Sequence, residues 1–298
     1  MNKKILRNLP LHIMLLPAMI LLLIYNYIPM AGNVMAFQKF NPVKGFFQSA
    51  WVGLKNFNYV LAMPDTFQVL WNTFFIAIMK MTAGILVPVF IALLLNEVRS
   101  QRYKRTLQTI VYFPHFLSWV ILSGILIDVL SPSKGIVGQI FTSMGLKPIF
   151  FLGDVKWFPY TLVITETWKE FGFGTIVYLA ALTGIDPTLY EASMIDGANR
   201  WKQVKHITIP GIMPIVVLMM ILSMGNILNA GFDPVYNLYS PQVYKTGDIL
   251  DTLVYRIGLL DFQYGVATAV GLFKSVVSFT MLAISYALAY KFTDYRVF

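Results

Sequence analysis

The sequence predicts an all-α membrane protein that crosses the bilayer six times. Of its 298 residues, 57% are hydrophobic and 12% are charged, whereas about 25% of the residues are charged in a soluble globular domain. A soluble core of this size could not bury so much apolar surface. Apolar runs of about 20 residues are long enough to cross a bilayer as helices, and isolated strands would leave backbone groups unsatisfied there.

Six such runs occur, at residues 11–36, 69–95, 107–130, 160–183, 212–231 and 264–290. The first follows basic residues, as a signal peptide would, but it is too long for a signal sequence and lacks a small-residue cleavage site, so we interpret it as an uncleaved span. We therefore expect one transmembrane domain over residues 1–298, without a soluble domain.

The distribution of basic residues predicts that both termini are cytoplasmic. The short loop between the second and third spans is the clearest indication, since it carries Arg99, Arg102, Lys104 and Arg105. The formal net charge of +9 is thus explained by membrane anchoring and does not require a nucleic-acid partner. Because the chain contains no cysteine, disulfides and Cys-ligated zinc are excluded.

The loop between the fourth and fifth spans, residues 186–210, predicts two short helices separated by a turn. Asp186 followed by Pro187 is a favourable helix start, and Gly197 can adopt the left-handed conformation that ends a helix. A second helix from about Asn199 to His206 should stop before Pro210. The loop carries apolar side chains, among them Tyr190, Met194, Ile195 and Trp201. It could insert into a groove on a soluble partner or lie on lipid headgroups.

Part of this loop closely resembles a family signature. Glu191-Ala192-Ser193, then Gly197, then Ile207-Thr208-Ile209-Pro210 match the EAA motif of binding-protein-dependent ABC importer permeases, with Ser193 and Ile209 as mild departures. The resemblance implies a coupling helix that docks on an ATPase subunit. The candidate coupling residues are Tyr190, Glu191, Ala192, Ser193, Met194, Asp196, Gly197, Trp201, Ile207 and Pro210.

Further stretches narrow the resemblance to the sugar branch and its LplB-like polysaccharide permeases. They are Tyr112-Phe113-Pro114-His115, the run from Trp168 to Ile185, and Ala269-Val270-Gly271-Leu272-Phe273-Lys274. The resemblance implies the type I importer permease fold, a bacterial plasma-membrane location and an oligosaccharide or polysaccharide substrate. It also implies three kinds of partner: a second homologous permease, two ATP-binding subunits that hold ATP and Mg, and an extracytoplasmic solute-binding protein.

Ionisable residues inside the predicted spans need a polar cavity or a partner, because a charge at membrane depth costs at least about 2.5 kcal/mol. Glu166, Lys169 and Glu170 are spaced i, i+3, i+4 and so share one face of the fourth span, with Phe173 on the adjoining surface. Lys80 and Lys274 are the other candidates. These groups could equally form structural pairs.

The family comparison implies that Glu166, Lys169, Glu170 and Phe173 match sugar-contacting positions of maltose transporter subunits. Asn226 and Asn229, spaced i, i+3 in the fifth predicted span, resemble the asparagine contacts of those subunits. The charged identities favour a charged or branched oligosaccharide over a plain glucan.

The sequence does not indicate an enzyme. It contains no Gly-Lys pair and so lacks the phosphate-binding loop G-x-x-x-x-G-K-[ST], which assigns ATP hydrolysis to another polypeptide. Its three histidines are scattered, and no H-E-x-x-H metal motif occurs. The alternative is a secondary transporter driven by an ion gradient, which would leave the EAA-like loop unexplained.

Overall fold

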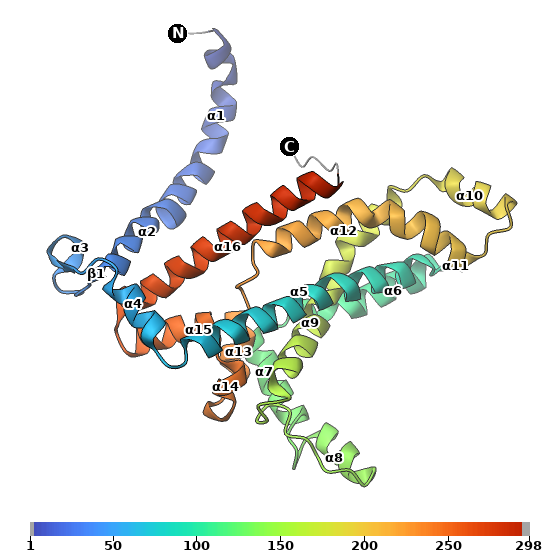
Figure 1. Ribbon diagram of the computed structural model, residues 1–298. Coiled ribbons are helices and arrows are strands. Elements are labelled where there is room, and N and C mark those ends of the chain that lie inside the picture. Colours follow the sequence, from blue (N-terminus) through green and yellow to red (C-terminus); the bar gives the residue numbers. More distant parts are fainter. Residues whose placement is uncertain (1–2, 294–298) are drawn as a thin grey trace. The chain divides into compact units, whose positions relative to one another are not determined.

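The computed structural model describes residues 3–293, with side chains described for residues 11–287. Nearly all regular structure is helical (Figure 1), and the only sheet in these residues is a two-stranded ladder. Both chain ends, predicted to be cytoplasmic, lie outside the described residues. The helices of four or more residues are α1 (Lys3–Leu22), α3 (Gly45–Gln48), α4 (Lys55–Ala62), α5 (Thr66–Asn96), α6 (Gln101–Tyr112), α7 (Trp119–Val129), α8 (Ile136–Ser143), α9 (Phe158–Thr183), α10 (Pro187–Ile195), α11 (Arg200–Gln203), α12 (Ile209–Met224), α13 (Phe232–Leu238), α14 (Tyr244–Gly247), α15 (Leu250–Tyr255) and α16 (Tyr264–Thr293).

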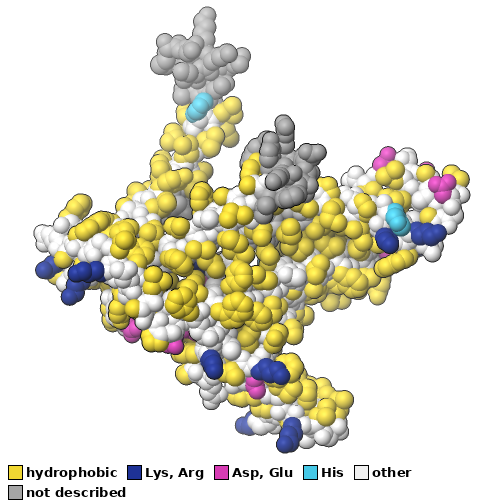
Figure 2. All heavy atoms as spheres, in the orientation of Figure 1, with side chains coloured by type: hydrophobic (Ala, Val, Ile, Leu, Met, Phe, Trp, Pro, Cys, Tyr) yellow, Lys and Arg dark blue, Asp and Glu magenta, His cyan; other side chains and the backbone are white. Residues whose placement is uncertain are grey.

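Four helical segments in the described residues are long and apolar enough to cross a membrane: Leu11–Phe37, Thr66–Asn96, Arg200–Met224 and Tyr264–Ala287. A fifth candidate is the bent pair α6 and α7. Helix α9 is long enough, but it carries Glu166, Lys169 and Glu170. The coarse prediction of a helical multi-span membrane protein is therefore confirmed, with four to five candidate spans by length and composition. Figure 2 shows hydrophobic side chains over much of the visible face of these helices.

The chain divides into two compact units. The first contains the described residues up to Thr66 together with Val254–Phe273. After α1, α2 (Ile28–Met30) and a 3₁₀ segment (Ala31–Phe37), strands β1 (Gln38–Lys39) and β2 (Ala50–Trp51) pair in antiparallel register, with Gln38 opposite Trp51. Helix α4 follows, and the later part of the unit consists of the end of α15, a π-helical turn (Arg256–Leu260) and the start of α16.

The second unit is built around α9, which packs against α6, α12, α13 and α14. Two apolar clusters lie at different levels along it. One contains Ile76, Ala77, Leu152, Phe158, Leu162, Ala230, Val235, Leu238, Val243 and Ile249, and the other contains Ala92, Tyr178, Leu182 and Ile212. Between these levels, α5 and α9 carry their charged residues. The polar groups of α9 thus occupy a layer between two apolar cores.

The third predicted span, residues 107–130, is not one straight helix. Helix α6 ends at Tyr112, and α7 begins at Trp119 after a bend of 100°. Pro114 lies in a short 3₁₀ turn, the chain becomes extended at Leu117, and the Ser118 hydroxyl caps α7 by accepting from the backbone N–H of Ile121 at 3.3 Å. The apolar run is continuous, but the backbone changes direction inside it.

The fifth predicted span, residues 212–231, is displaced toward the N-terminus. The helical segment begins at Arg200, passes through a π-helical turn (Val204–Thr208) and ends at Met224, where Gly225 forms the C-cap. The second loop helix therefore does not stop before Pro210 as predicted. Pro210 lies in the first turn of α12 directly after the π-helical turn, where a missing N–H is tolerated.

Candidate functional site

Helix α10 begins and ends as the sequence predicts. The Asp186 carboxylate accepts from the backbone N–H of Thr188 at 2.9 Å, and this backbone hydrogen bond lowers the pKa of Asp186 below its ordinary value. At the other end Gly197 has φ of +74°. The N–H of Ala198 bonds Ser193 O at 2.9 Å, and that of Gly197 bonds Met194 O at 3.1 Å, which is a Schellman motif.

Side-chain hydrogen bonds hold α10 against the start of the next helical segment. Gln203, which is 3% exposed, donates from Nε2 to the Ser193 hydroxyl at 2.9 Å. The hydroxyls of Tyr190 and Thr208 lie 3.0 Å apart. Ser193, the departure from the family's alanine, therefore supplies a bond that alanine could not make. The two arms of the loop form one rigid element.

Large apolar side chains of this element are exposed, together with acidic ones. Ile195 is 87% exposed, Trp201 74% and Met194 54%. Glu191 and Asp196 are also exposed. We call this surface, formed by Glu191, Met194, Ile195, Asp196 and Trp201, the loop surface. Large side chains left this exposed on a rigid element are typical of a protein interaction site.

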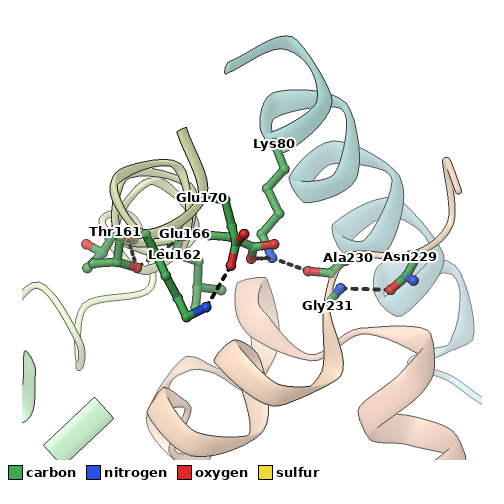
Figure 3. A network of polar contacts seen from close by, with 10 residues as sticks. Lys80, Thr161, Leu162, Glu166, Glu170, Asn229, Ala230 and Gly231 are labelled. Carbon is green, nitrogen blue, oxygen red and sulfur yellow. Dashed lines mark hydrogen bonds and ion pairs between the residues drawn. The ribbon is translucent and has the colours of Figure 1, made fainter. Parts of the chain in front are cut away.

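A second group of polar residues lies inside the helical bundle of the same unit. Lys80 of α5 forms an ion pair with Glu166 of α9 and donates a hydrogen bond to the backbone oxygen of Ala230 (Figure 3). The Lys80 side chain is 10% exposed and that of Glu166 27%. Three chain segments thus meet at one ammonium group. The neighbouring Gly231 has φ of +86°, and a Cβ there would lie 2.9 Å from Lys80 Nζ.

One turn further along α9, Lys169, Glu170 and His115 form a connected network. Lys169 Nζ donates to Glu170 Oε1 at 2.7 Å and to the backbone oxygen of His115 at 2.9 Å. The His115 Nδ1 atom lies 2.6 Å from Glu170 Oε2. Lys169 also lies over the ring of Trp119, 5.8 Å from its centroid. The bend after α6 brings His115 to this position.

A cavity of about 260 Å³ opens beside these groups. Its polar wall includes Lys80, Glu166 and Glu170, and its aromatic wall includes Phe173. The Phe173 ring is 48% exposed and stacks on His115, with ring centroids 4.2 Å apart and planes at 6°. The remaining lining residues are Gly84, Pro88, Thr167, Phe171 and Gly174. The cavity can therefore offer charged hydrogen-bonding groups and an aromatic face to one polar ligand.

The six predicted substrate-path residues are distributed unevenly around this cavity. Glu166, Glu170 and Phe173 line it, whereas Lys169 is 6% exposed and lies behind Glu170. Asn226 and Asn229 do not share a helix face, because α12 ends at Met224. Both are exposed and absent from the lining. The Asn229 side chain instead accepts from the N–H of Gly231 at 3.2 Å (Figure 3).

One residue of this polar network, His115, was not predicted as a site residue. His115 was noted only as part of the Tyr112-Phe113-Pro114-His115 stretch, and its contact with Glu170 spans 55 positions. The sequence feature that could have identified His115 is Pro114 before it, because a proline inside an apolar run breaks the helix and lets a polar side chain point away from it. In the described residues, no group of three or more His, Cys, Asp or Glu side chains could hold a metal ion.

A charged cavity within a bundle of apolar helices, together with a rigid exposed loop, defines a membrane transport subunit. Residues 84–294 match the family described as binding-protein-dependent transport system inner membrane component. The chain therefore belongs to this family, is a multi-pass protein of the bacterial plasma membrane and has the type I ABC permease fold. Membership rejects the alternative of a transporter driven by an ion gradient.

Two relatives from Bacillus subtilis (strain 168) match almost the whole chain. The polygalacturonan/rhamnogalacturonan transport system permease protein YteP is 38% identical over 99% of this chain and 92% of its own length. Protein LplB is 39% identical, over 97% of this chain and 91% of its own length.

A solved structure extends the similarity to three dimensions. A chain of a bacterial ABC transporter involved in the import of the acidic polysaccharide alginate superposes with a TM-score of 0.90, at 37% identity and 98% coverage of both chains. The same TM-score and identity are found for the alginate transporter in complex with an alginate pentasaccharide-bound periplasmic protein, with 99% coverage of both chains.

Proposed function

We propose that this chain forms half of the translocation path of an importer for an acidic oligosaccharide or polysaccharide. Its partners are a second homologous permease, two ATP-binding subunits and a solute-binding protein that delivers the glycan. The chain itself is not an enzyme, and ATP and Mg are held by the ATP-binding subunits. The observation that carries the proposal is the loop surface, which presents apolar and acidic side chains on a hydrogen-bonded element whose sequence matches the family's signature.

The loop surface is the site at which ATP would drive transport. The cap at Asp186, the Schellman turn at Gly197 and the bond between Ser193 and Gln203 make the element rigid. A rigid element that is continuous with the span ending at Met224 transmits a displacement into the bundle. ATP shifts the conformational equilibrium only if the ATPase dimer prefers one position of this loop.

The cavity beside α9 is proposed as part of the substrate path. Ionisable groups at membrane depth are expected to face a polar cavity or one another. Here Lys80 pairs with Glu166, and Glu170 faces the cavity. Phe173 offers a ring face to the apolar side of a sugar, and Glu166 and Glu170 can accept bonds from its hydroxyls. Lys169, located behind Glu170 and bonded to it, would orient that carboxylate and offset its charge, so that an acidic sugar is repelled less. Relatives that carry acidic polysaccharides support this substrate class.

We further propose six spans in one domain over residues 1–298, with both termini cytoplasmic. Helix α9 would be the fourth span, crossing the membrane with its charged side turned to the path. The bent pair α6 and α7 would together form the third. The 26-residue length of α9 and the apolar clusters on both sides of its charged layer support this assignment.

Purification of the chain from its native membrane with its subunits, followed by ATPase and uptake assays, tests the proposal. We expect recovery of a second permease and an ATPase, and an activity stimulated by an acidic glycan with its binding protein. Glu191→Lys and Gly197→Asp should leave the protein in the membrane but uncouple hydrolysis from uptake. Thr183→Ser, at an exposed site outside the loop, is the matched control. Ion-driven uptake by the chain alone would contradict the proposal.

The substrate class has its own test. We expect Lys169→Gln to lower uptake of a galacturonate oligosaccharide more than it lowers uptake of a neutral oligosaccharide of equal length. Unchanged uptake of the acidic glycan would contradict the assignment of Lys169 while leaving the importer itself intact.

A further inference from the structure

The first compact unit contains a larger cavity, of about 510 Å³, which is of a size typical for small-ligand sites. Its wall is formed by the segment between the first two predicted spans and by the residues that begin the last one. The lining residues are Gln38, Lys39, Phe40, Val52, Lys55, Asn56, Tyr59, Phe262, Gln263, Tyr264, Gly265 and Val266. All belong to one unit, and none belongs to the α9 cavity or the loop surface.

The charge of this cavity has one sign. Lys39 and Lys55 line it, and no Asp or Glu does. Both lysines are exposed, and within residues 11–287 neither forms an ion pair. Asp261, the acidic residue closest in sequence to Phe262, is exposed and not part of the wall. An anionic ligand would therefore find two uncompensated ammonium groups.

The backbone at the rim is strained. Phe262 has φ of +56° and is the only residue other than glycine with positive φ in the described chain. A bulky side chain is unfavourable in this conformation, which glycine and asparagine adopt far more readily. The ring is 70% exposed, so burial in a core does not offset the strain. Its contact with Tyr264 is edge-on, with centroids 6.4 Å apart. Strain of this kind tends to persist at ligand-binding positions.

The floor of the cavity is closely packed and polar. A Cβ on Gly265 would lie 2.5 Å from Gln38 O and 2.9 Å from Asn56 Nδ2. Asn56 donates to the backbone oxygens of Ala36 and Gln38, at 2.8 and 3.0 Å. The Gln38 amide donates to Phe46 O at 2.8 Å, but its buried Oε1 has no hydrogen-bond partner in the described residues. Because this oxygen is closed to solvent, the floor supports the cavity, and a ligand would be held by the exposed residues of the wall.

We propose that this cavity is an extracytoplasmic subsite that binds one or two acidic sugar rings of the substrate. The proposal rests on the proposed function, because it assumes an imported glycan and an extracytoplasmic position for this segment. The two lysines bind the carboxylate, the exposed rings of Tyr59 and Phe262 pack against the apolar face of the sugar, and the exposed Gln263 amide bonds its hydroxyls. A neutral glycan would gain only the last two kinds of contact.

Binding is tested on the complete importer in nanodiscs of phosphatidylcholine, without binding protein, by calorimetric titration with trigalacturonate and with galactotriose. We expect tighter binding of trigalacturonate, weakened by salt. The double variant Lys39→Gln/Lys55→Gln should lose about tenfold in affinity for trigalacturonate, a change of about 1.4 kcal/mol in binding free energy, because exposed ion pairs are individually weak. Its affinity for galactotriose should change little. Lys44→Gln, an exposed lysine of the same segment outside the wall, is the matched control.

The outcomes separate this proposal from the proposed function. Wild-type importer without glycan-stimulated ATPase activity would overturn the function itself. A wild-type importer that transports trigalacturonate, with a double variant that binds and transports it equally well, would overturn only the subsite. A double variant that retains its affinity but is no longer stimulated by the binding protein would show that the lysines dock that protein, and this result also overturns the subsite.

Phe262→Asn provides a second test. Asparagine tolerates positive φ, so the thermal unfolding temperature of the importer should stay the same or rise, while affinity for trigalacturonate falls several-fold. A ring that only packs the unit would give the opposite result, with lower stability and unchanged affinity.

Discussion

At the scale of single residues, the ion pair between Lys80 and Glu166 joins α5 to α9 through residues that are 86 positions apart in the sequence. The pair lies in the polar layer between two apolar cores. Removing one partner of a buried ion pair leaves the other charge uncompensated, and this costs more than the net contribution of the pair. The contact can therefore hold the helices in register and keep charged groups at the wall of the α9 cavity. Mutations of the two residues can separate these two roles.

We expect Lys80→Met to lower the free energy of unfolding of the importer by about 3 kcal/mol, since Glu166 would remain partly buried without its partner. The double variant Lys80→Gln/Glu166→Gln should recover most of this loss, because two amides can bond each other and Ala230 O. Thermal unfolding of the purified complex measures both. If the double variant is as unstable as the single one, the loss comes from altered packing and not from an unpaired charge.

Individual residues were predictable where the interaction is local. The cap at Asp186 and the left-handed Gly197 follow from neighbours within a few positions, and both are confirmed. The pairing of Glu166 with Lys80, the burial of Lys169 and the stacking of His115 on Phe173 depend on contacts between segments distant in sequence. Helical spacing placed Glu166, Lys169 and Glu170 on one face, but it could not show which of them would line a cavity.

At the scale of elements, the crossing of α9 and α6 depends on one glycine. A Cβ on Gly172 would lie 1.9 Å from the backbone oxygen of Val111, so no side chain fits without a shift of the helices. This close approach also holds the bend after α6, and with it His115, against α9. Small residues permit such crossings in membrane proteins.

Gly172→Ala should therefore destabilise the protein by about 1–3 kcal/mol, the usual range for overpacking, and lower transport through displacement of His115. Gly124→Ala on α7 is the control, because a Cβ at this position meets nothing within 4 Å. The free energy of unfolding of this variant should be unchanged or higher by up to about 1 kcal/mol. Equal unfolding temperatures for the two variants would contradict the close crossing.

The cap of α10 makes that helix sensitive to acid. Because the folded-state pKa of Asp186 lies below its unfolded value, the cap stabilises α10 fully above the unfolded pKa of about 3.9. This stabilisation is lost as the pH falls through the folded-state pKa. Hydrogen exchange of residues 187–195, corrected for intrinsic rates, should therefore accelerate below about pH 4. Asp186→Asn keeps a capping oxygen but cannot titrate, so an identical acid response in this variant would exclude the carboxylate as its cause.

Element boundaries were less predictable than element type. Hydropathy reports how apolar a run is and not the direction of its backbone, so the bend at Pro114–Ser118 and the helix end at Gly225 were missed. The second loop helix was expected to end before Pro210, but the π-helical turn allows the helix to continue. This end of α12 removes Asn226 and Asn229 from the shared face on which their prediction depended.

At the scale of the whole molecule, the number and direction of the spans decide on which side of the membrane the loop surface lies. Composition correctly predicted a helical membrane protein, because the apolar excess cannot be buried in a soluble fold. Hydropathy alone does not mark α9, the predicted fourth span, as a span in the described residues, because its charged residues lower the mean hydropathy of the helix. Only the contacts of Glu166, Lys169 and Glu170 show how their charges are accommodated.

The absence of native cysteine allows this topology to be mapped with single cysteines and no background labelling. With six spans and cytoplasmic termini, cysteines replacing Lys134 or Lys156 should react with a membrane-impermeant maleimide in intact cells. Cysteines replacing Lys104 or Lys202 should react only after the membrane is permeabilised. Lys134, Lys156 and Lys202 are exposed and Lys104 is half-buried, and uptake by each variant serves as the control for folding. If α9 did not cross the membrane, positions 156 and 202 would lie on the same side and label together, which would contradict the proposed topology and the proposed docking of the loop surface on an ATP-binding subunit.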